Sequence, residues 1–184
     1  MWAAVASEIT IGSMCSGIGG LELGLKAGFE SRGFKVRTIW QCEQDQYCRA
    51  VLARHFPEST IYEDVNSDAF QKAIQKEEQP DYVCFGFPCQ DLSVAGHQKG
   101  IHGARSSLFF RCWELSMLVR PRPTIIMENV SNITVNGALS AVLGTIHASG
   151  YNAEWCMLSA AECGARHRRK RWFLVANPDT VGQS

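Results

Sequence analysis

Residues 9–32 read ITIGSMCSGIGGLELGLKAGFESR, and this stretch decides the fold class. Residues 9–14 form a short apolar run of the kind found in a buried strand. Further on, Leu21, Leu25 and Phe29 recur at a spacing of four, which is typical of a helix. Glycines lie between the two segments and allow a tight turn. The stretch therefore predicts a strand over 9–14 and a helix over 19–32, joined by a glycine turn.

The same alternation of strand and helix continues along the chain. Such alternation predicts an α/β fold with a doubly wound, mostly parallel sheet and helices on both faces. In that architecture ligands bind outside the carboxyl ends of the strands, so the residues just after each strand are the candidates for chemistry. We expect further strands over 35–41, 60–62, 81–85 and 124–127, helices over 45–55, 66–76, 106–119 and 137–149, and a last strand pair over 151–158 and 172–176.

Length and composition point to one globular domain over residues 1–184, with a polar tail over 176–184. Hydrophobic residues make up 46% of the chain and charged residues 20%, which excludes a disordered protein. No apolar run approaches the roughly 20 residues of a membrane span. The N-terminus has no basic region typical of a signal peptide. We therefore expect a cytoplasmic protein with no membrane partner.

The distribution of charge and the cysteine content indicate which kinds of binding site the chain can have. The 18 basic and 18 acidic residues balance, yet residues 166–171 read RHRRKR. Such a run favours a local contact with an anion such as phosphate, and a solvated basic turn is the alternative. The eight cysteines contain no CxxC pair, so we expect neither a zinc ribbon nor a disulfide scaffold. Buried thiols in a reducing cytosol, and no metal site, are the prediction, with Cys89 as the exception.

The ends of the first three predicted strands suggest a cofactor. The segment 15–20, CSGIGG, allows close approach of the backbone to a ligand at a helix N-terminus. Its glycines do not complete the GxGxxG pattern, because Glu22 stands at the sixth position. Glu43 lies 23 residues past Gly20 and is placed to accept hydrogen bonds from ribose hydroxyls, or else to cap a helix as Asp45 does. Asp64 follows the third strand and would hold a base edge, or belong to a surface turn.

The ends of the fourth and fifth strands suggest covalent chemistry. Residues 86–90 read GFPCQ and begin a loop of about 20 residues, which is long for a compact domain. A thiol at the rim of the sheet, such as Cys89, is a candidate nucleophile. Glu128 follows the apolar run 125–127, and burial of its carboxyl suits a proton donor. The pair suggests nucleophilic catalysis assisted by an acid.

These blocks together resemble the DNA (cytosine-5)-methyltransferases over about residues 9–176, in that family's order. The matching blocks are SGIGGL at 16–21, Glu43, Asp64, GFPCQDLS at 86–93, RSSLFF at 105–110, ENV at 128–130 and RKR at 169–171. The resemblance implies a Rossmann-like methyltransferase fold, S-adenosylmethionine as cofactor and double-stranded DNA as substrate. It also implies that the target cytosine is flipped out of the duplex, attacked at C6 by Cys89, assisted at N3 by Glu128 and methylated at C5.

The resemblance assigns roles to individual residues. Arg169 and Arg171 join Cys89 and Glu128 as catalytic residues, with Arg171 at the base O2 and a nearby phosphate. Glu43 would hold the ribose, Asp64 the adenine amine and residues 17–20 the methionine end. The full set of implied cofactor contacts is Cys15, Gly17, Ile18, Gly19, Gly20, Glu43, Gln44, Asp64, Val65, Pro88 and Leu108. The implied DNA contacts are Gln90, Ser93, Lys99, Arg105, Asn129 and Arg168.

The sequence also departs from the family pattern. Cys15 stands where an aromatic residue is frequent, His167 where Gln is common and Arg166 where Pro is usual.

No segment resembles the target-recognition domain or the last helix of the family, so we expect a truncated chain or a second chain that supplies recognition. A non-catalytic cofactor- or DNA-binding fragment of a split methyltransferase is the alternative. A nicotinamide-dependent dehydrogenase would explain only the glycine turn. The restriction-modification or phage self-protection setting implies a bacterial or phage source.

Overall fold

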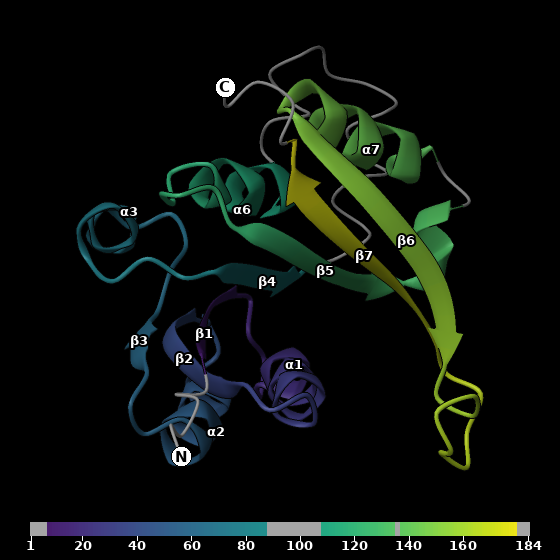
Figure 1. Cartoon of the computed structure of the whole chain (residues 1–184), viewed down its shortest axis with the longest axis horizontal. Helices are drawn as coiled ribbons and strands as arrows, with labels where there is room; N and C mark the ends of the chain where they lie inside the picture. Colours follow the sequence, from purple (N-terminus) through teal and green to yellow (C-terminus); the bar gives the residue numbers. More distant parts are fainter. Residues whose placement is uncertain (1–6, 88–107, 135–136, 180–184) are drawn as a thin grey trace, which may run out of the picture. The chain divides into compact units, whose positions relative to one another are not determined.

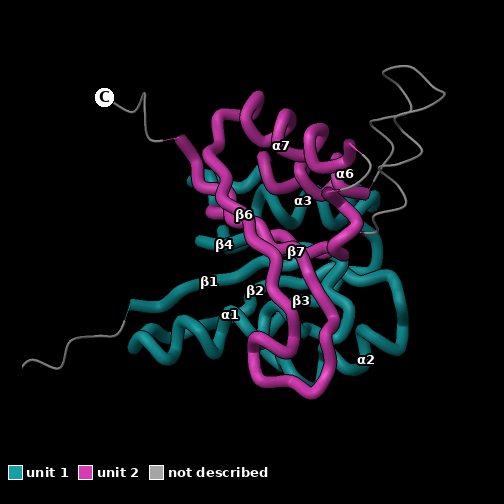
Figure 2. The backbone as a smooth tube through the Cα atoms, turned by 90° about the vertical axis from the view of Figure 1, so that its right-hand side faces the viewer, with its two compact units in different colours: residues 1–85, 118–123 teal, residues 86–117, 124–184 magenta. Residues whose placement is uncertain are grey.

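The computed structural model describes residues 7–87, 108–134 and 137–179 (Figure 1). The chain divides into two compact units, coloured separately in Figure 2. Unit 1 contains residues 1–85 and 118–123, and unit 2 contains residues 86–117 and 124–184. Each unit has its own strands, helices and buried side chains.

The described strands of unit 1 form a parallel sheet in the order β3-β2-β1-β4. The strands are β1 (Glu8–Met14), β2 (Lys35–Cys42), β3 (Thr60–Tyr62) and β4 (Tyr82–Gly86), the last residue of which belongs to unit 2. Because the strands are parallel, the segments that follow β1, β2 and β3 all leave the same edge of this sheet. The predicted parallel α/β arrangement is confirmed here.

Helices connect these strands, and short polar side chains start two of them. The helices are α1 (Gly20–Glu30), α2 (Gln46–His55) and α3 (Asp68–Lys76). Asp45 caps α2 by accepting a 2.9 Å hydrogen bond from the backbone N–H of Cys48. Ser67 caps α3 in the same way, with the N–H of Phe70 as donor at 3.2 Å. The predicted cap Asp45 is confirmed, and each cap satisfies an N–H group that the helix itself cannot.

The described strands of unit 2 are antiparallel, in the order β5-β7-β6. This unit contains α6 (Leu108–Ser116), β5 (Thr124–Val130), the 3₁₀ helix η1 (Ser131–Thr134), α7 (Ala138–Ala148), β6 (Tyr151–Ser159) and β7 (Lys170–Pro178). Tyr151 in β6 pairs with Pro178, and Ser159 pairs with Lys170 at the other end of the hairpin. The predicted last strand pair is therefore confirmed, and its strands run antiparallel.

Two predicted boundaries in unit 2 are wrong. We expected β5 to end at Met127, but pairing with β7 continues through Glu128 to Val130. We also expected a tail from residue 176, but residues 176–178 still pair with β5 and β6. Ladder hydrogen bonds with a neighbouring strand, which a single segment does not reveal, extend both elements.

Each unit has an apolar interior. In unit 1 the fully buried side chains include Ile11, Met14, Leu52, Phe70 and Ile74. In unit 2 they include Phe109, Leu115, Ile125, Met127, Trp172 and Leu174. Trp113 in α6 donates its indole N–H to Ser149 Oγ at 2.9 Å, and its ring contacts Tyr151 edge-on, which ties α6 to the start of β6.

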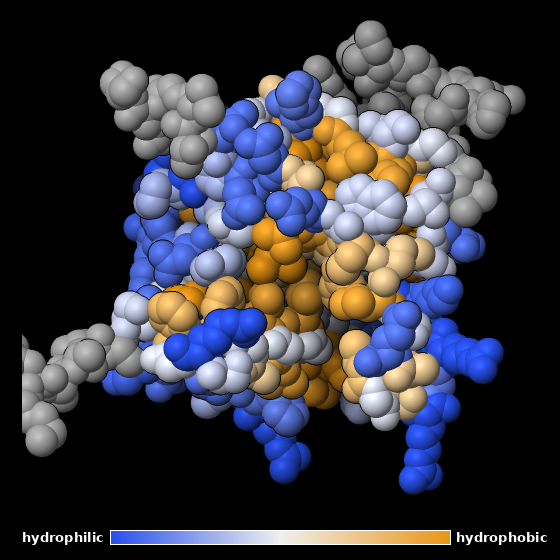
Figure 3. Space-filling model, turned by 45° about the vertical axis from the view of Figure 1, so that its right-hand side comes forward, coloured by the Kyte–Doolittle hydropathy of each residue, from blue (hydrophilic) through white to orange (hydrophobic). Residues whose placement is uncertain are grey.

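Several apolar side chains and two cysteines lie at the surface. Trp155, Leu158 and Val175 are exposed on the β6–β7 hairpin. Figure 3 shows apolar surface that is open to solvent on the face turned forward. The prediction of buried thiols holds for Cys42, Cys84 and Cys112 but is wrong for Cys156 and Cys163, which are exposed. Within the described residues, no helix has the length and apolar character needed to cross a membrane.

Candidate active site

The turn between β1 and α1 has a backbone shape that depends on glycine. Gly17 and Gly19 have φ angles of 55° and 86°, in the left-handed region that side chains disfavour. The N–H of Gly19 donates to the carbonyl of Ser16 at 2.9 Å, and Ser16 Oγ donates to Ser13 Oγ at 2.9 Å below it. A side chain at Gly19 would also collide with the ring of Phe56. The turn is therefore a defined structure and not merely a gap between elements.

The same turn leaves room for a ligand. A Cβ atom added at Gly17 or Gly20 would meet no atom within 4 Å. Ile18 lies between these glycines, and its side chain is 56% exposed. Open space beside two glycines, a helix N-terminus and one exposed apolar side chain fit the methionine end of S-adenosylmethionine, which the family resemblance assigns to residues 17–20.

Glu43 uses one carboxylate oxygen to bind this turn and the other to bind the backbone at the start of α2. Its Oε2 accepts the N–H of Gly17 at 2.7 Å, and its Oε1 accepts the N–H of Asp45 at 2.9 Å. A carboxylate oxygen has two lone-pair directions, so each oxygen can accept one further hydrogen bond. Glu43 is thus oriented with acceptor capacity to spare, which fits the two hydroxyls of a ribose.

Other predicted cofactor residues gather at the same edge of the unit 1 sheet. Burial raises the pKa of the Cys42 thiol, and the charges of Cys15, Asp64 and Glu43 raise it further. These three side chains therefore lie around the end of β2. Asp64 is exposed, and its Oδ1 accepts the N–H of Asn66 at 2.8 Å. Cys15 has a φ of 52°, Val65 is buried, and Gln44 is exposed.

Sequence reasoning missed Arg49, which binds the backbone of Glu43 and so helps to hold that residue in place. Its guanidinium donates to the carbonyl oxygens of Glu43 and Gln44 at 3.1 and 2.6 Å, and it forms an ion pair with Glu63 at 3.1 Å. An arginine one turn into α2 has no sequence signature that distinguishes it from a solvated surface cation. Its role depends on how α2 packs beside the end of β2.

In unit 2, Glu128 and Arg171 form an ion pair across the sheet. Glu128 pairs with Phe173 in the β5–β7 ladder, and Val130 pairs with Arg171. Alternate residues of a strand share a face, so Glu128 and Arg171 are diagonal neighbours on one face. Arg171 Nε lies 2.7 Å from Glu128 Oε1, and the side chains are 22% and 32% exposed. The sequence predicted both residues, and the structure brings them together.

The other oxygen of Glu128 faces the end of β4. A Cβ atom added at Gly86 would lie 3.3 Å from Glu128 Oε2. Burial raises the pKa of Glu128, and the nearby charge of Arg169 lowers it without cancelling the rise. The carboxyl is thus ion-paired through Oε1, while Oε2 points to the segment that leads to Cys89. The arginines favour the ionised carboxyl and burial favours the protonated one. Because the net shift of the Glu128 pKa is upward, the group can hold a proton beside that segment.

Asn129 anchors the same segment. Its Nδ2 donates to the carbonyl of Phe87 at 2.8 Å, and its Oδ1 accepts the N–H of Val130 at 2.7 Å. The side chain is buried, and the ring of Phe87 contacts that of Phe109. With both ends of its amide engaged inside unit 2, Asn129 fits an anchoring role better than the predicted contact with DNA.

The predicted basic turn joins β6 to β7. Residues 161–170 are all exposed, including Arg168 and Arg169. Ser159 and Glu162 close the turn reciprocally, because the N–H of Ser159 donates to Glu162 Oε2 at 2.6 Å and the N–H of Glu162 donates to Ser159 Oγ at 3.2 Å. The cations are therefore presented on an ordered hairpin end, and the charge of Arg169 reaches Glu128.

Several predicted residues lie outside the described part of the chain. These are Pro88, Cys89, Gln90, Ser93, Lys99 and Arg105. Leu108, also predicted, is the first residue of α6 and is half-buried. On either side of the undescribed residues, the structure fixes Phe87 and α6, which are joined through Phe109.

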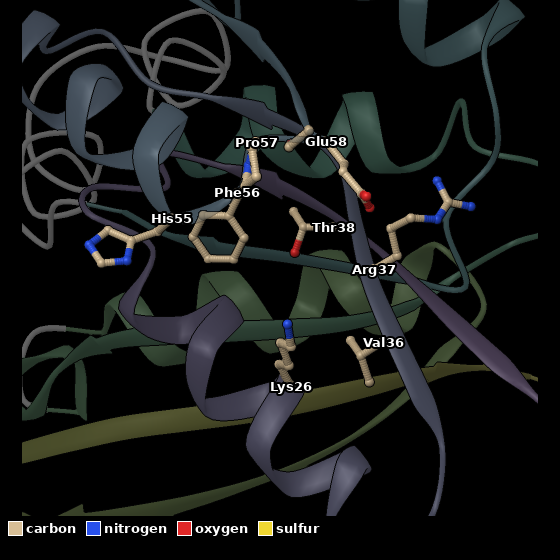
Figure 4. Close-up of a pocket in the computed structure, with 9 residues that line it drawn as sticks. Lys26, Val36, Arg37, Thr38, His55, Phe56, Pro57 and Glu58 are labelled. Carbon is tan, nitrogen blue, oxygen red and sulfur yellow. The ribbon is translucent and has the colours of Figure 1, made fainter. Parts of the chain in front are cut away.

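A hollow in unit 1 lies apart from the predicted site. It has a volume of about 280 Å³, and none of the predicted site residues lines it. Figure 4 shows Lys26 reaching into it near Thr38 and Phe56. The remaining residues of its lining are Val36, Arg37, His55, Pro57, Glu58 and Ser59.

Comparison with known proteins supports the resemblance. The family model of the C-5 cytosine-specific DNA methylase matches residues 9–181. The Type II methyltransferase M2.BsuMI of Bacillus subtilis is 36% identical over 90% of this chain and 41% of its own length. M.Bsp6I of a Bacillus species and M.NgoBI of Neisseria gonorrhoeae are each 30% identical, over 91% and 90% of this chain and 51% and 50% of their own lengths. The chain spans about half the length of these relatives.

Solved structures share the fold. Dnmt2 methyltransferase of S. pombe matches 97% of this chain and 52% of its own chain with a TM-score of 0.71 at 16% identity. DNMT2 of Spodoptera frugiperda matches 95% of this chain and 51% of its own with a TM-score of 0.69 at 17% identity. The predicted α/β methyltransferase fold is therefore confirmed. Together with the match over residues 9–181, this shows that the chain belongs to the C-5 cytosine-specific DNA methylase family.

Proposed function

We propose that this chain carries the catalytic and cofactor-binding residues of a DNA (cytosine-5)-methyltransferase. Members of this family use S-adenosylmethionine. The substrate is a cytosine flipped out of double-stranded DNA, because a base inside the stack does not expose C6 to a nucleophile. The bacterial sources of the relatives and their Type II names support a role in restriction-modification in a bacterial cytoplasm.

In this proposal unit 1 binds the cofactor. Residues 17–20 hold its methionine end, Glu43 accepts from the ribose hydroxyls, and Asp64 accepts from the adenine amine. When bound, the cofactor supplies an electrophilic methyl group. The proposal is supported by the room beside Gly17 and Gly20 and by the two-point anchoring of Glu43. Further contacts are proposed for Cys15, Ile18, Gln44, Val65, Pro88 and Leu108.

Unit 2 and the segment after Gly86 carry the chemistry. The Cys89 thiolate forms a bond to C6, and the electrons of the C5–C6 double bond shift to C5. A proton on Glu128 bonded to N3 draws charge from the ring and makes this addition easier. C5 would then take the methyl group from a bound cofactor, whose sulfur would keep the electron pair of the broken S–CH₃ bond, and the C5 proton leaves to solvent. The electrons of the C5–H bond then restore the double bond, and the C6–S bond breaks to release the thiolate.

The observation that carries the proposal is the placement of Glu128. It lies half-buried beside Gly86, three residues before Cys89, with its pKa raised by burial and its Oε1 held by Arg171. A carboxyl held beside the segment that leads to a cysteine matches the needs of acid-assisted addition. An ion pair that served only to stabilise the fold would not need to place the Glu128 carboxyl beside Gly86.

DNA contacts are proposed for the basic turn and the loop after Cys89. Arg171 would contact the base O2 and a phosphate, with Arg169 beside the flipped nucleotide. Arg168, Gln90, Ser93, Lys99 and Arg105 would contact the backbone. Phosphate contacts of this kind position a protein on DNA without reading its sequence.

A second candidate function follows from the length comparison. The matched relatives are about twice as long as this chain. We therefore keep the proposal that the chain binds the cofactor but transfers methyl groups only together with further polypeptide, such as a second chain that supplies target recognition.

The test is methyl transfer from labelled S-adenosylmethionine to mixed-sequence DNA, with a 5-fluorocytosine duplex to trap the covalent adduct. Incorporation and a trapped adduct, both lost in Cys89→Ser but not in Cys156→Ser, are the expected results for a complete catalytic unit. Cys156 is an exposed cysteine on β6 and serves as the matched control. Cofactor binding without incorporation supports the second candidate, and the absence of both overturns the proposal.

A further inference from the structure

Unit 1 buries a glutamate and a glutamine against each other. Glu22 in the first turn of α1 and Gln41 near the end of β2 are both 0% exposed. Gln41 Nε2 donates to Glu22 Oε1 at 3.0 Å. A carboxyl is rarely buried completely in a small domain unless it is paired or used. Glu22 is also the residue that interrupts the GxGxxG pattern of the turn.

The Glu22–Gln41 pair is not the most stable way to fill this part of the interior of unit 1. Among the described residues, neither Glu22 Oε2 nor Gln41 Oε1 has a hydrogen-bond partner. Replacing a buried polar pair of this kind by apolar side chains of similar volume is often neutral or stabilising. The pair does fix the arrangement of α1 and β2, because a hydrogen bond between their side chains holds the two elements at one distance and orientation.

Both α1 and β2 lie next to residues that are proposed to bind the cofactor. Glu22 follows Gly20 by two residues, and Gln41 precedes Glu43 by two. Backbone groups also link the same segments. The N–H of Ser16 donates to the carbonyl of Cys42 at 3.3 Å, and the N–H of Gly17 donates to Glu43 Oε2 at 2.7 Å. The Glu22–Gln41 bond is the member of this set that joins two side chains.

We infer that Glu22 is a positioning residue for cofactor binding. Paired with Gln41, it sets the separation between the glycine turn and Glu43, so that one ligand reaches both. The inference rests on the proposed function, which gives the methionine end of the cofactor to the turn and its ribose to Glu43. Glu22 itself is buried and acts through the backbone that it holds.

The test separates positioning from stability with methionine, an unbranched apolar side chain close in length to both residues. Glu22→Met and Gln41→Met each leave one polar partner buried and alone, whereas the double variant removes both. Each single variant should unfold at a lower temperature and bind S-adenosylmethionine about tenfold more weakly, the usual scale for a lost buried hydrogen bond. The double variant should regain thermal stability while its affinity stays about tenfold reduced.

Two further variants complete the experiment, and calorimetry of S-adenosylmethionine binding is the readout for all of them. Glu22→Gln can form a reciprocal pair with Gln41 and should keep the affinity of the unaltered chain. Glu30→Met, at the exposed end of the same helix, is the matched control and should also leave affinity unchanged.

The outcomes are distinguishable. A double variant whose affinity recovers together with its stability would show a merely structural pair and overturn the inference, while the proposed function would stand. A loss of affinity in Glu22→Gln that equals the loss in Glu22→Met would also overturn it. An unaltered chain that does not bind S-adenosylmethionine would overturn the proposed function and this inference with it.

Discussion

Unit 1 and unit 2 assemble their candidate groups in different ways. In unit 1 the groups follow parallel strands, and their contacts run from side chain to backbone, as between Glu43 and the N–H of Gly17. In unit 2 the groups lie inside antiparallel strands, and the central contact runs from side chain to side chain, between Glu128 and Arg171. Parallel strands bring loops together at one edge, whereas an antiparallel register brings together residues in the middle of strands.

This difference separates two functions that can be disturbed independently. The unit 1 contacts organise a backbone turn with open space beside it, which suits binding. The unit 2 contacts hold one carboxyl in place, and burial raises its pKa, which suits proton chemistry. Changes in unit 1 should therefore affect affinity, and changes in unit 2 should affect rate.

The largest expected effect is on rate in unit 2. Glu128→Gln should lower methyl transfer by about 10²–10⁴-fold, the range for loss of a positioned acid, because the amide has no proton of comparable acidity to place on the ring. Single-turnover transfer to DNA measures this, and calorimetry should find cofactor affinity unchanged. Equal losses of rate and affinity would contradict the division between the units.

The next effect is on the stability of unit 1. Gly19→Ala should lower the free energy of unfolding by about 1–3 kcal/mol, because a side chain there must adopt a left-handed backbone and meets Phe56. Gly24→Ala is the matched control, since Gly24 lies inside α1 with no atom near an added Cβ. It should raise stability by about 0.5–1 kcal/mol. Urea unfolding of both variants measures these changes. Equal destabilisation of the two variants would show that the turn has no particular need for glycine at position 19.

A smaller effect is expected on binding at Glu43. Glu43→Ala removes the acceptor of two backbone N–H groups and of the proposed ribose contact. Affinity for S-adenosylmethionine should fall roughly tenfold, with little change in DNA binding. Equilibrium titrations of the two ligands check this. An unchanged cofactor affinity would remove Glu43 from the binding site.

The smallest effect is a pH dependence from Glu128. Its pKa is raised in the folded chain by burial, above the value of about 4.3 expected in the unfolded chain. The stability that it contributes is therefore complete below about pH 4.3 and is lost as the pH rises through the folded-state pKa. Compared with Glu128→Gln, the unaltered chain should become relatively less stable over that rise. Thermal unfolding of both chains across acidic to neutral pH measures the difference, and parallel curves would mean that the carboxyl does not titrate differently in the two states.

Much of unit 1 could be predicted from local patterns. The strand over 9–14, the helix after it and the caps Asp45 and Ser67 follow from apolar spacing and side-chain chemistry within a few residues. The meeting of Gly17 and Glu43 could also be expected, because parallel strands place their carboxyl ends together. Arg49 and the Glu22–Gln41 pair could not, since their roles depend on how a helix packs beside β2.

In unit 2 the motifs named residues whose placement they did not predict. Glu128 and Arg171 were named from motifs, but Glu128 was expected after a strand and lies inside one. Asn129 was expected at DNA and is buried against Phe87. A motif identifies which side chains matter chemically, whereas the pairing of β5 with β7 decides which face each of them occupies.

Local spacing and motifs read in order were enough to predict the family, the alternation of strands and helices, and the residue types of the candidate site. The ion pair between Glu128 and Arg171, the burial of Asn129 and the contact of Glu22 with Gln41 depend instead on the folded arrangement of the chain. Each of these contacts joins residues brought together by strand register or helix packing. Register and packing are set by the burial of many side chains at once, and no single stretch of sequence contains that information.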